Sequence, residues 1–299
     1  MMPPNKAKPL VTFWGTRGSV PTPGRITEKY GGNTPCVTVR YQDIHTIFDA
    51  GTGIRNLGID LIEEYNKTGK GLSLHLFFSH THWDHIQGLP FFQPVYIKDT
   101  NLTIYGSPHK EHFLASILKG QMDYEYFPIG MSEFSADITI QEISEEVLHL
   151  GEVIIDWQEQ VRHPGGSVRY RLDINGKKIV YATDVELDLI FHSHADTKKN
   201  KAMAQDYLDF IYNVDLLIAD GQYTDKEYPS KKGWGHSSIQ LLLDIAYRAQ
   251  VKQLAIFHHD PQHSDQFLDE LWMENRSKFH SDYKKMDVFW AREGMTLAI

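Results

Sequence analysis

Cysteine is almost absent from this sequence, because Cys36 is the single one among 299 residues. One thiol cannot build an intrachain disulfide framework, which excludes the class of small secreted domains held together by disulfides. Residues 1–10 contain prolines and lysines but no long apolar run, so we expect neither a signal peptide nor a membrane span. These absences predict a protein of a reducing compartment, the cytoplasm, with no membrane partner. Cys36 itself is expected to be a small, packed hydrophobic side chain.

Basic residues are also scarce. The chain has 30 Lys and Arg against 39 Asp and Glu, a formal net charge of −9. This balance argues against a broad electropositive surface, so a stable nucleic-acid complex is not expected and a small anionic substrate is favoured. The length and the 41% hydrophobic content allow one large core or two modest ones, and we expect one domain over residues 1–299. A homodimer is one alternative that the sequence leaves open.

Histidine is plentiful, with sixteen in the chain, and three of them stand within six residues. The motif His80-Thr81-His82-Trp83-Asp84-His85 directly follows an apolar run, residues 72–78, that is typical of a buried strand. Alternation along an extended backbone places His80 and His82 on one side, and a turn can bring Asp84 and His85 back toward them. Imidazoles and carboxylates are ligands of zinc and similar divalent ions, and Asp84 and His85 are more than one tetrahedral ion needs beside His80 and His82. The motif therefore predicts two metal ions, whereas the alternative is a polar loop of solvated histidines.

At these residues the sequence resembles the metallo-β-lactamase-fold hydrolases, whose defining motif is His-X-His-X-Asp-His. The resemblance covers residues 13–263 and is strongest to the branch that contains tRNase Z and phosphodiesterase-like members. It implies an α/β (α+β) protein with an αββα sandwich. The sequence lacks the extended basic, glycine-rich arm with which tRNase Z members grip tRNA, so weak binding of precursor tRNA is expected.

Further candidate ligands follow other expected strands. Residues 153–161 form an expected strand that leads to His163, and residues 179–183 form another that ends at Asp184. A carboxylate has two oxygens to share between two ions, and Asp184 is the candidate for that position. After residues 251–257, two adjacent histidines cannot both face one pocket. The resemblance assigns His258, the first of them, to the second metal. It places His80, His82 and His163 on the first metal, and Asp84, His85 and His258 on the second.

Two residues near the expected ligands have other interpretations. Asp49 ends the expected strand at residues 46–48; the resemblance makes it orient a ligand histidine, and capping of the following turn is the alternative. His236 opens a helix expected to extend to residue 249, with Ser237 or Ser238 as its cap. The resemblance implies that His236 transfers protons without binding a metal. Asp84 and His236 are the predicted catalytic residues.

These observations predict a dinuclear metal-dependent hydrolase, a phosphodiesterase acting on a small phosphodiester or nucleotide through a metal-activated water. Zinc is the expected metal, with manganese and iron as alternatives. A second hypothesis keeps the site but changes the bond to a lactone, thioester, β-lactam or sulfate ester. A third is a non-catalytic binding or sensor module, which predicts missing ligands; all seven candidates are present.

Overall fold

Two mixed β-sheets form the centre of the molecule, and the computed structural model describes residues 7–107, 113–143, 147–192 and 198–299. Within these residues each sheet has seven strands. In spatial order the first sheet contains β14 (Thr296–Ala298), β1 (Leu10–Gly15), β2 (Cys36–Tyr41), β3 (Ile44–Phe48), β4 (Leu72–Phe77), β5 (Thr100–Gly106) and β6 (Asp137–Glu142). The second contains β13 (Asp287–Trp290), β12 (Gln253–Phe257), β11 (Leu216–Asp220), β10 (Lys177–Ala182), β9 (Ser167–Ile174), β8 (Val153–Gln160) and β7 (Leu148–Leu150).

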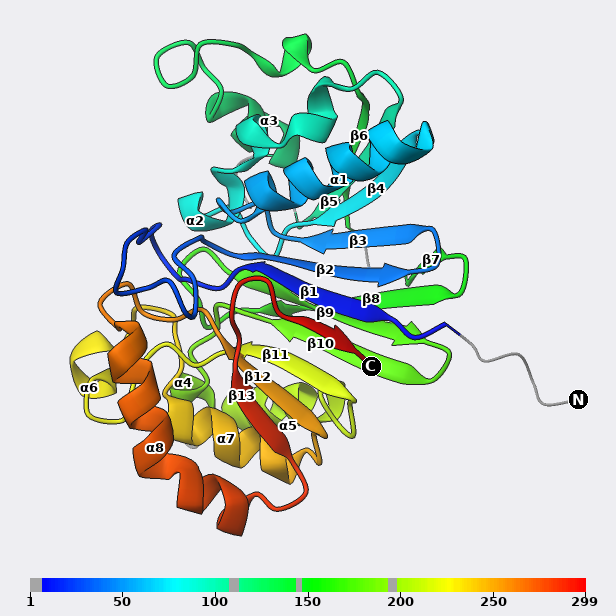
Figure 1. Cartoon of the computed structure of the whole chain (residues 1–299). Coiled ribbons are helices and arrows are strands. Elements are labelled where there is room, and N and C mark those ends of the chain that lie inside the picture. The colour runs from blue at the N-terminus through cyan, green and yellow to red at the C-terminus, as the bar shows by residue number, and fades with distance from the viewer. Residues whose placement is uncertain (1–6, 108–112, 144–146, 193–197) are drawn as a thin grey trace, which may run out of the picture.

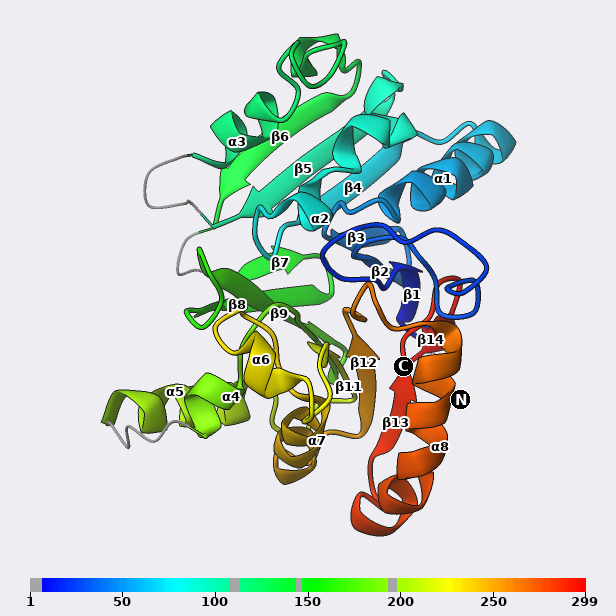
Figure 2. The same ribbon diagram turned by 90° about the vertical axis from the view of Figure 1, so that its left-hand side faces the viewer.

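Helices cover the outer face of each sheet (Figures 1 and 2). The helices on the first half are α1 (Ile54–Thr68), the short α2 (Trp83–Ile86) and α3 (Leu114–Gly120), with 3-10 turns η1 (Leu89–Phe91), η2 (Gln93–Tyr96) and η3 (Met131–Glu133). Those on the second half are α4 (Asp188–Phe191), α5 (Lys198–Phe210), α6 (Tyr228–Lys231), α7 (Ile239–Arg248) and α8 (Asp265–Asp282). The expected αββα sandwich is therefore confirmed.

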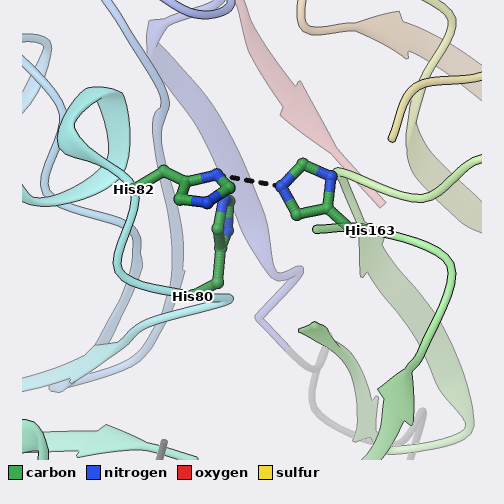
Figure 3. Close-up of side chains that lie close together, drawn as sticks. All are labelled: His80, His82 and His163. Atoms are coloured by element: carbon green, nitrogen blue, oxygen red, sulfur yellow. Dashed lines mark hydrogen bonds between the residues drawn. The ribbon is translucent and has the colours of Figure 1, made fainter. Parts of the chain in front are cut away.

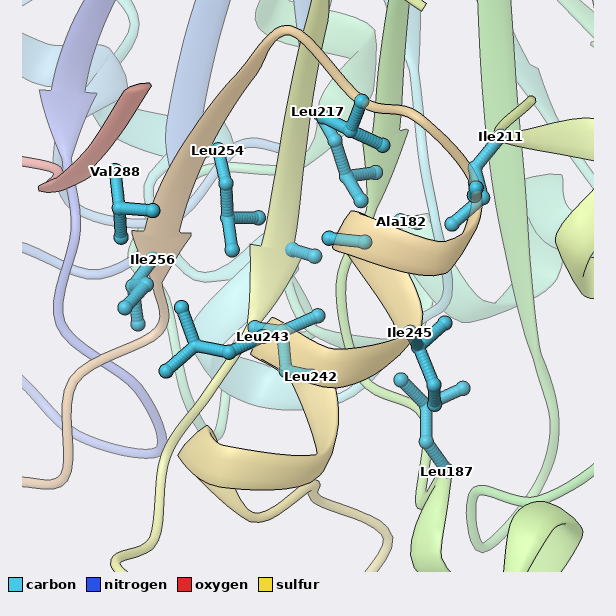
Figure 4. Close-up of a cluster of buried hydrophobic side chains, with 14 of the residues drawn as sticks. Ala182, Leu187, Ile211, Leu217, Leu242, Leu243, Ile245, Leu254, Ile256 and Val288 are labelled. Atoms are coloured by element: carbon cyan, nitrogen blue, oxygen red, sulfur yellow. The ribbon is translucent and has the colours of Figure 1, made fainter. Parts of the chain in front are cut away.

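Three apolar clusters hold these layers together. The middle cluster joins the facing sides of the two sheets, with Phe48 and Phe77 from the first sheet against Tyr170 and Tyr181 from the second. The outer clusters join each sheet to its helices. In one of them, Leu242 and Ile245 of α7 belong to the same apolar cluster as residues of β11 and β12 (Figure 4). Burying a leucine or isoleucine side chain contributes about 1.5–3 kcal/mol, so apolar spacing on the strands and α7 is what places the layers.

Strand direction gathers the ends of several strands at one edge of the molecule. Strands β3, β4 and β5 are parallel to one another, as are β10, β11 and β12. Strand β8 is antiparallel to β9, which is antiparallel to β10, so β8 also ends at this edge. The hairpin between β9 and β10 turns at Asn175 and Gly176, which both have positive φ as the Asn-Gly pair predicts.

Among the described residues, no helix is long and apolar enough to cross a membrane. The prediction about the N-terminal segment partly concerns residues 1–6, which lie outside the described residues.

Candidate metal centre

The histidine motif occupies a strand, a turn and the start of a helix. Strand β4 ends at Phe77, His82 has an extended backbone, and α2 contains Asp84 and His85. Two bonds fasten this turn to the other sheet: the Val168 N–H donates to the Ser79 carbonyl (2.8 Å) and the Tyr170 hydroxyl donates to the Phe78 carbonyl (2.6 Å). The motif is thus held at the seam between the two halves of the sandwich.

His80, His82 and His163 form a first group of side chains (Figure 3). The Nε2 atom of His163 lies 2.9 Å from the Nδ1 atom of His82, and the ring of His80 lies 4.5 Å from that of His82 between centroids. His80 and His163 are buried, whereas His82 is exposed. Burial and the neighbouring His163 lower the pKa of His82 to about 4, so its lone pair is available at neutral pH.

Asp84, His85, Asp184 and His258 form a second group, and all four are buried. The Nε2 atoms of His85 and His258 each lie 3.2 Å from Oδ2 of Asp84. Burial alone would raise the pKa of Asp84, but His85 and His258 hold it well below its usual range. The group therefore combines ionised carboxylate oxygen with imidazole nitrogen.

Asp184 lies between the two groups and turns a different oxygen to each. Its Oδ2 is 3.6 Å from His80 Nε2 and 3.8 Å from His163 Nε2. Its Oδ1 is 3.4 Å from His85 Nε2 and 3.3 Å from His258 Nε2. Asp184 and His258 both adopt positive φ, 54° and 62°, a backbone conformation that costs energy for residues other than glycine and often marks functional sites.

Hydrogen bonds to the other ring nitrogen orient these imidazoles. His163 Nδ1 donates to the Gly235 carbonyl (2.9 Å) and His85 Nδ1 donates to Asp49 (2.7 Å). Since a carbonyl or carboxylate can only accept, both Nδ1 atoms carry a proton and Nε2 keeps its lone pair in the neutral ring.

The same tautomer is set on the two remaining buried rings. The Ser79 hydroxyl donates to Asp49 (2.8 Å), so it accepts from His80 Nδ1, 3.0 Å away. His258 Nδ1 donates to the Gln222 side-chain oxygen (3.0 Å). In their neutral form, all four rings therefore direct an unprotonated Nε2 toward the centre.

The residues present fit divalent metal ions. The Nε2 atoms of His80 and His85 are buried and have no hydrogen-bond partner among the described residues, a costly arrangement unless a cation binds there. Burial would lower the pKa of His85, but the carboxylates of Asp84, Asp184 and Asp49 raise it well above its usual value. This centre therefore attracts positive charge.

Asp49 contacts a candidate ligand directly, which is the first of the two interpretations above. Its carboxylate is fully buried and accepts from the Ser79 N–H and hydroxyl, from His85 Nδ1 and from the Tyr181 hydroxyl at 2.7–2.8 Å. Its φ is 60°, again in the left-handed region.

His236 lies beside both candidate groups. Its ring stacks on that of His258 at 4.9 Å between centroids, and its Nδ1 is 2.8 Å from Asp220. Burial would lower the pKa of His236, but the carboxylate of Asp220, followed by those of Asp184 and Asp84, raises it to about 9. Asp184, Asp220, His236 and His258 form a third group of the kind that can hold a metal. However, the Nδ1 atom of His236 is already bonded to Asp220.

The helix after His236 begins differently from the expected capped start. Ser238 precedes α7 but its hydroxyl makes no bond to the helix. Instead, Asp188 accepts from the Ser238 N–H and hydroxyl, both at 2.8 Å. Ser238 thus holds the expected N-cap position, but its hydroxyl bonds to a buried carboxylate of α4 and not to a backbone N–H of the helix.

Two other sequence expectations concern residues outside the centre. His259 is buried and its Nε2 donates to the Ala291 carbonyl (2.8 Å), away from both groups. Burial, with Arg17 nearby, lowers its pKa to about 3. Cys36 is buried within the apolar cluster of the first half, as expected.

Three contacts at the centre had no clear signal in the sequence. Gln222 orients His258, and the backbone N–H of Ser19 donates to Oδ2 of Asp84 (2.8 Å). Gly18 lies so close to His258 that a Cβ would overlap the ring. The glycines of residues 15–18 were the available signal, because they permit close approach of a loop, but the same pattern occurs in ordinary turns.

Comparisons with known proteins agree with the fold. Residues 47–259 match the family model described as the Beta-lactamase superfamily domain. Ribonuclease Z of Picrophilus torridus is 25% identical over 321 residues, covering 93% of this chain and 94% of that protein. Among solved structures, the metallo-beta-lactamase fold protein YhfI of Bacillus subtilis has a TM-score of 0.68 at 17% identity, covering 97% of this chain and 99% of that one. Unliganded yeast PDE1 has a TM-score of 0.69 at 14% identity, covering 98% and 100%.

Proposed function

The chain belongs to the beta-lactamase superfamily, and we propose that it is a dinuclear metal-dependent hydrolase that cleaves the phosphodiester bond of a small substrate or nucleotide. The relative from Picrophilus torridus supports the bond type, because its name, ribonuclease Z, describes cleavage of RNA, which is a phosphodiester polymer.

The position of Asp184 is the main support for a site with two metal ions. One of its oxygens faces the first group and the other faces the second, as a carboxylate shared by two ions would. The proposed ligands are His80, His82 and His163 for one ion, and Asp84, His85 and His258 for the other, with Asp184 between them. Zinc suits this nitrogen and oxygen set, with manganese and iron as alternatives.

Bound here, divalent ions would supply hydroxide at neutral pH and stabilise negative charge that develops on the phosphoryl group. The protein holds the imidazoles in place through Asp49, Ser79, Gln222 and the Gly235 carbonyl. His236 gives its Nδ1 proton to the bond with Asp220, so Nε2 is the ring nitrogen left for the substrate. When protonated, that nitrogen can donate to the leaving oxygen.

The remaining parts of the proposal concern substrate size and organisation. The net charge of −9 favours a small diester over a long RNA. Because the relative is named ribonuclease Z, RNA is the alternative substrate that an experiment must test. We also propose one domain over residues 1–299 and a cytoplasmic location. The oligomeric state, monomer or homodimer, stays open.

Metal analysis and a substrate screen test the proposal. The protein is stripped with chelator, reconstituted separately with zinc, manganese or iron, and assayed against diesters, monoesters, lactones and β-lactams. We expect close to two ions per chain and turnover of diesters in preference to the other classes. One ion or none would contradict the dinuclear centre, and turnover confined to lactones or β-lactams would contradict the bond type. Efficient, salt-sensitive cleavage of precursor tRNA would contradict the substrate size.

A further inference from the structure

Two tryptophans beside the candidate centre are exposed to solvent. Trp83 and Trp234 are 77% and 57% exposed, whereas the other four tryptophans of the chain are buried or half-buried. Tryptophan is usually largely buried, because its indole is the largest apolar side chain. Trp83 stands between His82 and Asp84, and Trp234 is two residues before His236. Both exposed tryptophans therefore lie within one or two residues of candidate site residues.

Both tryptophans are sequence neighbours of residues near the exposed part of the centre. In the first group only His82 is exposed, so solvent reaches that group past His82, next to Trp83. His163 lies 2.9 Å from His82 and donates to the carbonyl of Gly235, the neighbour of Trp234. Two hydrogen bonds thus join the neighbour of Trp83 on the first half to the neighbour of Trp234 on the second. Figure 2 shows α2 and α6, the helices next to these residues, on the same face.

The backbone around each indole is held in place. Trp83 begins α2, and its carbonyl accepts from the Gln87 N–H (2.8 Å). On the other side, the buried carboxylate of Glu186 accepts from the N–H groups of Gly233 (2.8 Å) and Gly235 (3.0 Å), which bracket Trp234. A backbone that is already fixed lowers the conformational entropy that these residues lose when a ligand binds.

A cation lies against one of the indoles. The Nζ atom of Lys231 is 4.2 Å from the centroid of the Trp234 ring, within the range of a cation–π contact. It is also 5.8 Å from the centroid of Tyr223, whose ring contacts His236. Lys231 therefore lies within reach of both rings, and only the ring of Tyr223 separates its positive charge from His236.

We propose that Trp83 and Trp234 stack on a nucleobase of the substrate, so that the proposed phosphodiesterase takes nucleotide diesters in preference to diesters without a base. The inference rests on the proposed function for the bond that is cleaved, but it adds what the two indoles recognise. Stacking tolerates every base, because each has a flat π face. Lys231 adds attraction for the phosphate charge of the same ligand.

Matched substrates separate base recognition from cleavage. One is a dinucleotide and the other is its abasic analogue, which carries the same phosphodiester without the bases. Wild-type protein should have the lower KM for the dinucleotide. In Trp83→Ala and Trp234→Ala we expect the KM for the dinucleotide to rise roughly 5- to 100-fold, the loss expected for one stacked base. The KM for the abasic analogue and the metal content should change less than about twofold, and the phenylalanine variants should recover most of the loss.

A control variant and a binding measurement complete the test. Tyr212→Ala removes another exposed ring (52% exposed) that precedes β11, at the opposite end of that strand from Asp220, and should change neither KM. Binding of a nucleoside 5′-monophosphate should quench tryptophan fluorescence, whereas ribose 5-phosphate should not, and Trp234→Ala should remove part of the quenching.

The results distinguish failure of this inference from failure of the proposed function. If wild-type protein cleaves both diesters with equal KM and the tryptophan variants behave like Tyr212→Ala, the base-stacking role is wrong and the phosphodiesterase stands. If the tryptophan variants lose metal, or lose both substrates equally, the indoles are structural. If no diester is cleaved while base-dependent quenching persists, the proposed reaction is wrong and the base site stands. Absence of quenching in that case would overturn both.

Discussion

Replacing Asp49 with asparagine should weaken metal binding by changing the tautomer of His85. One oxygen of Asp49 accepts from the Ser79 N–H, and the other accepts from the Ser79 hydroxyl, His85 Nδ1 and the Tyr181 hydroxyl. Asparagine keeps the shape but puts an NH2 group in place of one oxygen. If the NH2 group faced the Ser79 N–H, two hydrogen-bond donors would face each other, and neither of them can become an acceptor. We therefore expect NH2 to face His85, where the hydroxyls can rotate and the ring can move its proton to Nε2.

The tautomer change removes the lone pair that His85 would offer to a metal. Loss of a group that orients a ligand typically costs about 10- to 100-fold in metal affinity, which is about 1.4–2.7 kcal/mol. Asp49→Ala should behave differently, because it leaves the His85 tautomer free but removes the acceptor of four buried donors. At about 1–3 kcal/mol for each unsatisfied donor, we expect the alanine variant to lose about 4 kcal/mol or more of folding stability. Its metal affinity should fall less than that of the asparagine variant.

Metal titration in competition with a chelator and denaturant unfolding of the metal-free protein measure these two effects. Asp215→Asn is a matched control, since Asp215 is also buried and hydrogen-bonded but lies just before β11, at the opposite end of the strand from the centre. It should change stability and not metal affinity. If Asp49→Asn binds both ions as tightly as wild type, or if the alanine variant binds them more weakly than the asparagine variant, the tautomer argument is refuted.

Three further predictions follow from other contacts. His236→Ala should keep both metal ions but lower turnover about 100- to 10,000-fold on diesters with poor leaving groups, and much less with nitrophenolate; loss of a metal, or equal loss on both substrates, would make it a ligand or a binding residue. Gly18→Ala should push its new methyl group into His258 and reduce metal affinity about 10-fold or more in the same titration, whereas unchanged affinity would show that the loop yields. Burial would raise the pKa of Asp215, but the Lys178 N–H and the ammonium groups of Lys252 and Lys177 lower it. The charged form of Asp215 therefore stabilises the folded state at pH values above the usual aspartate pKa. Asp215→Asn should lower the free energy of unfolding by about 1–2 kcal/mol at pH 7, and this difference from wild type should disappear as the pH falls below about 4.

The fold and the local part of the centre could be predicted because their signals lie within short stretches. The apolar run before His80 and the apolar spacing of α7 each specify a buried face from a few neighbouring residues. The motif itself brings four candidate ligands together within six residues, since a strand, a turn and a short helix are enough to gather them. The αββα sandwich and the family are confirmed, whereas the ligand roles of the seven residues stay predictions.

Tertiary structure alone decided how the two halves meet. The sequence names His163, Asp184 and His258 as residues at strand ends, but it cannot say which oxygen of Asp184 faces which imidazoles. Likewise, the sequence predicted Ser237 or Ser238 as the cap of α7, and Ser238 is the N-cap residue, but packing of α4 directs its hydroxyl to Asp188. Gln222, the Ser19 N–H and the Gly235 carbonyl orient their partners through loop contacts over long sequence separations. Hydrophobic periodicity determines which face of an element is buried, whereas these contacts depend on the path of loops whose polar groups carry no periodic signal.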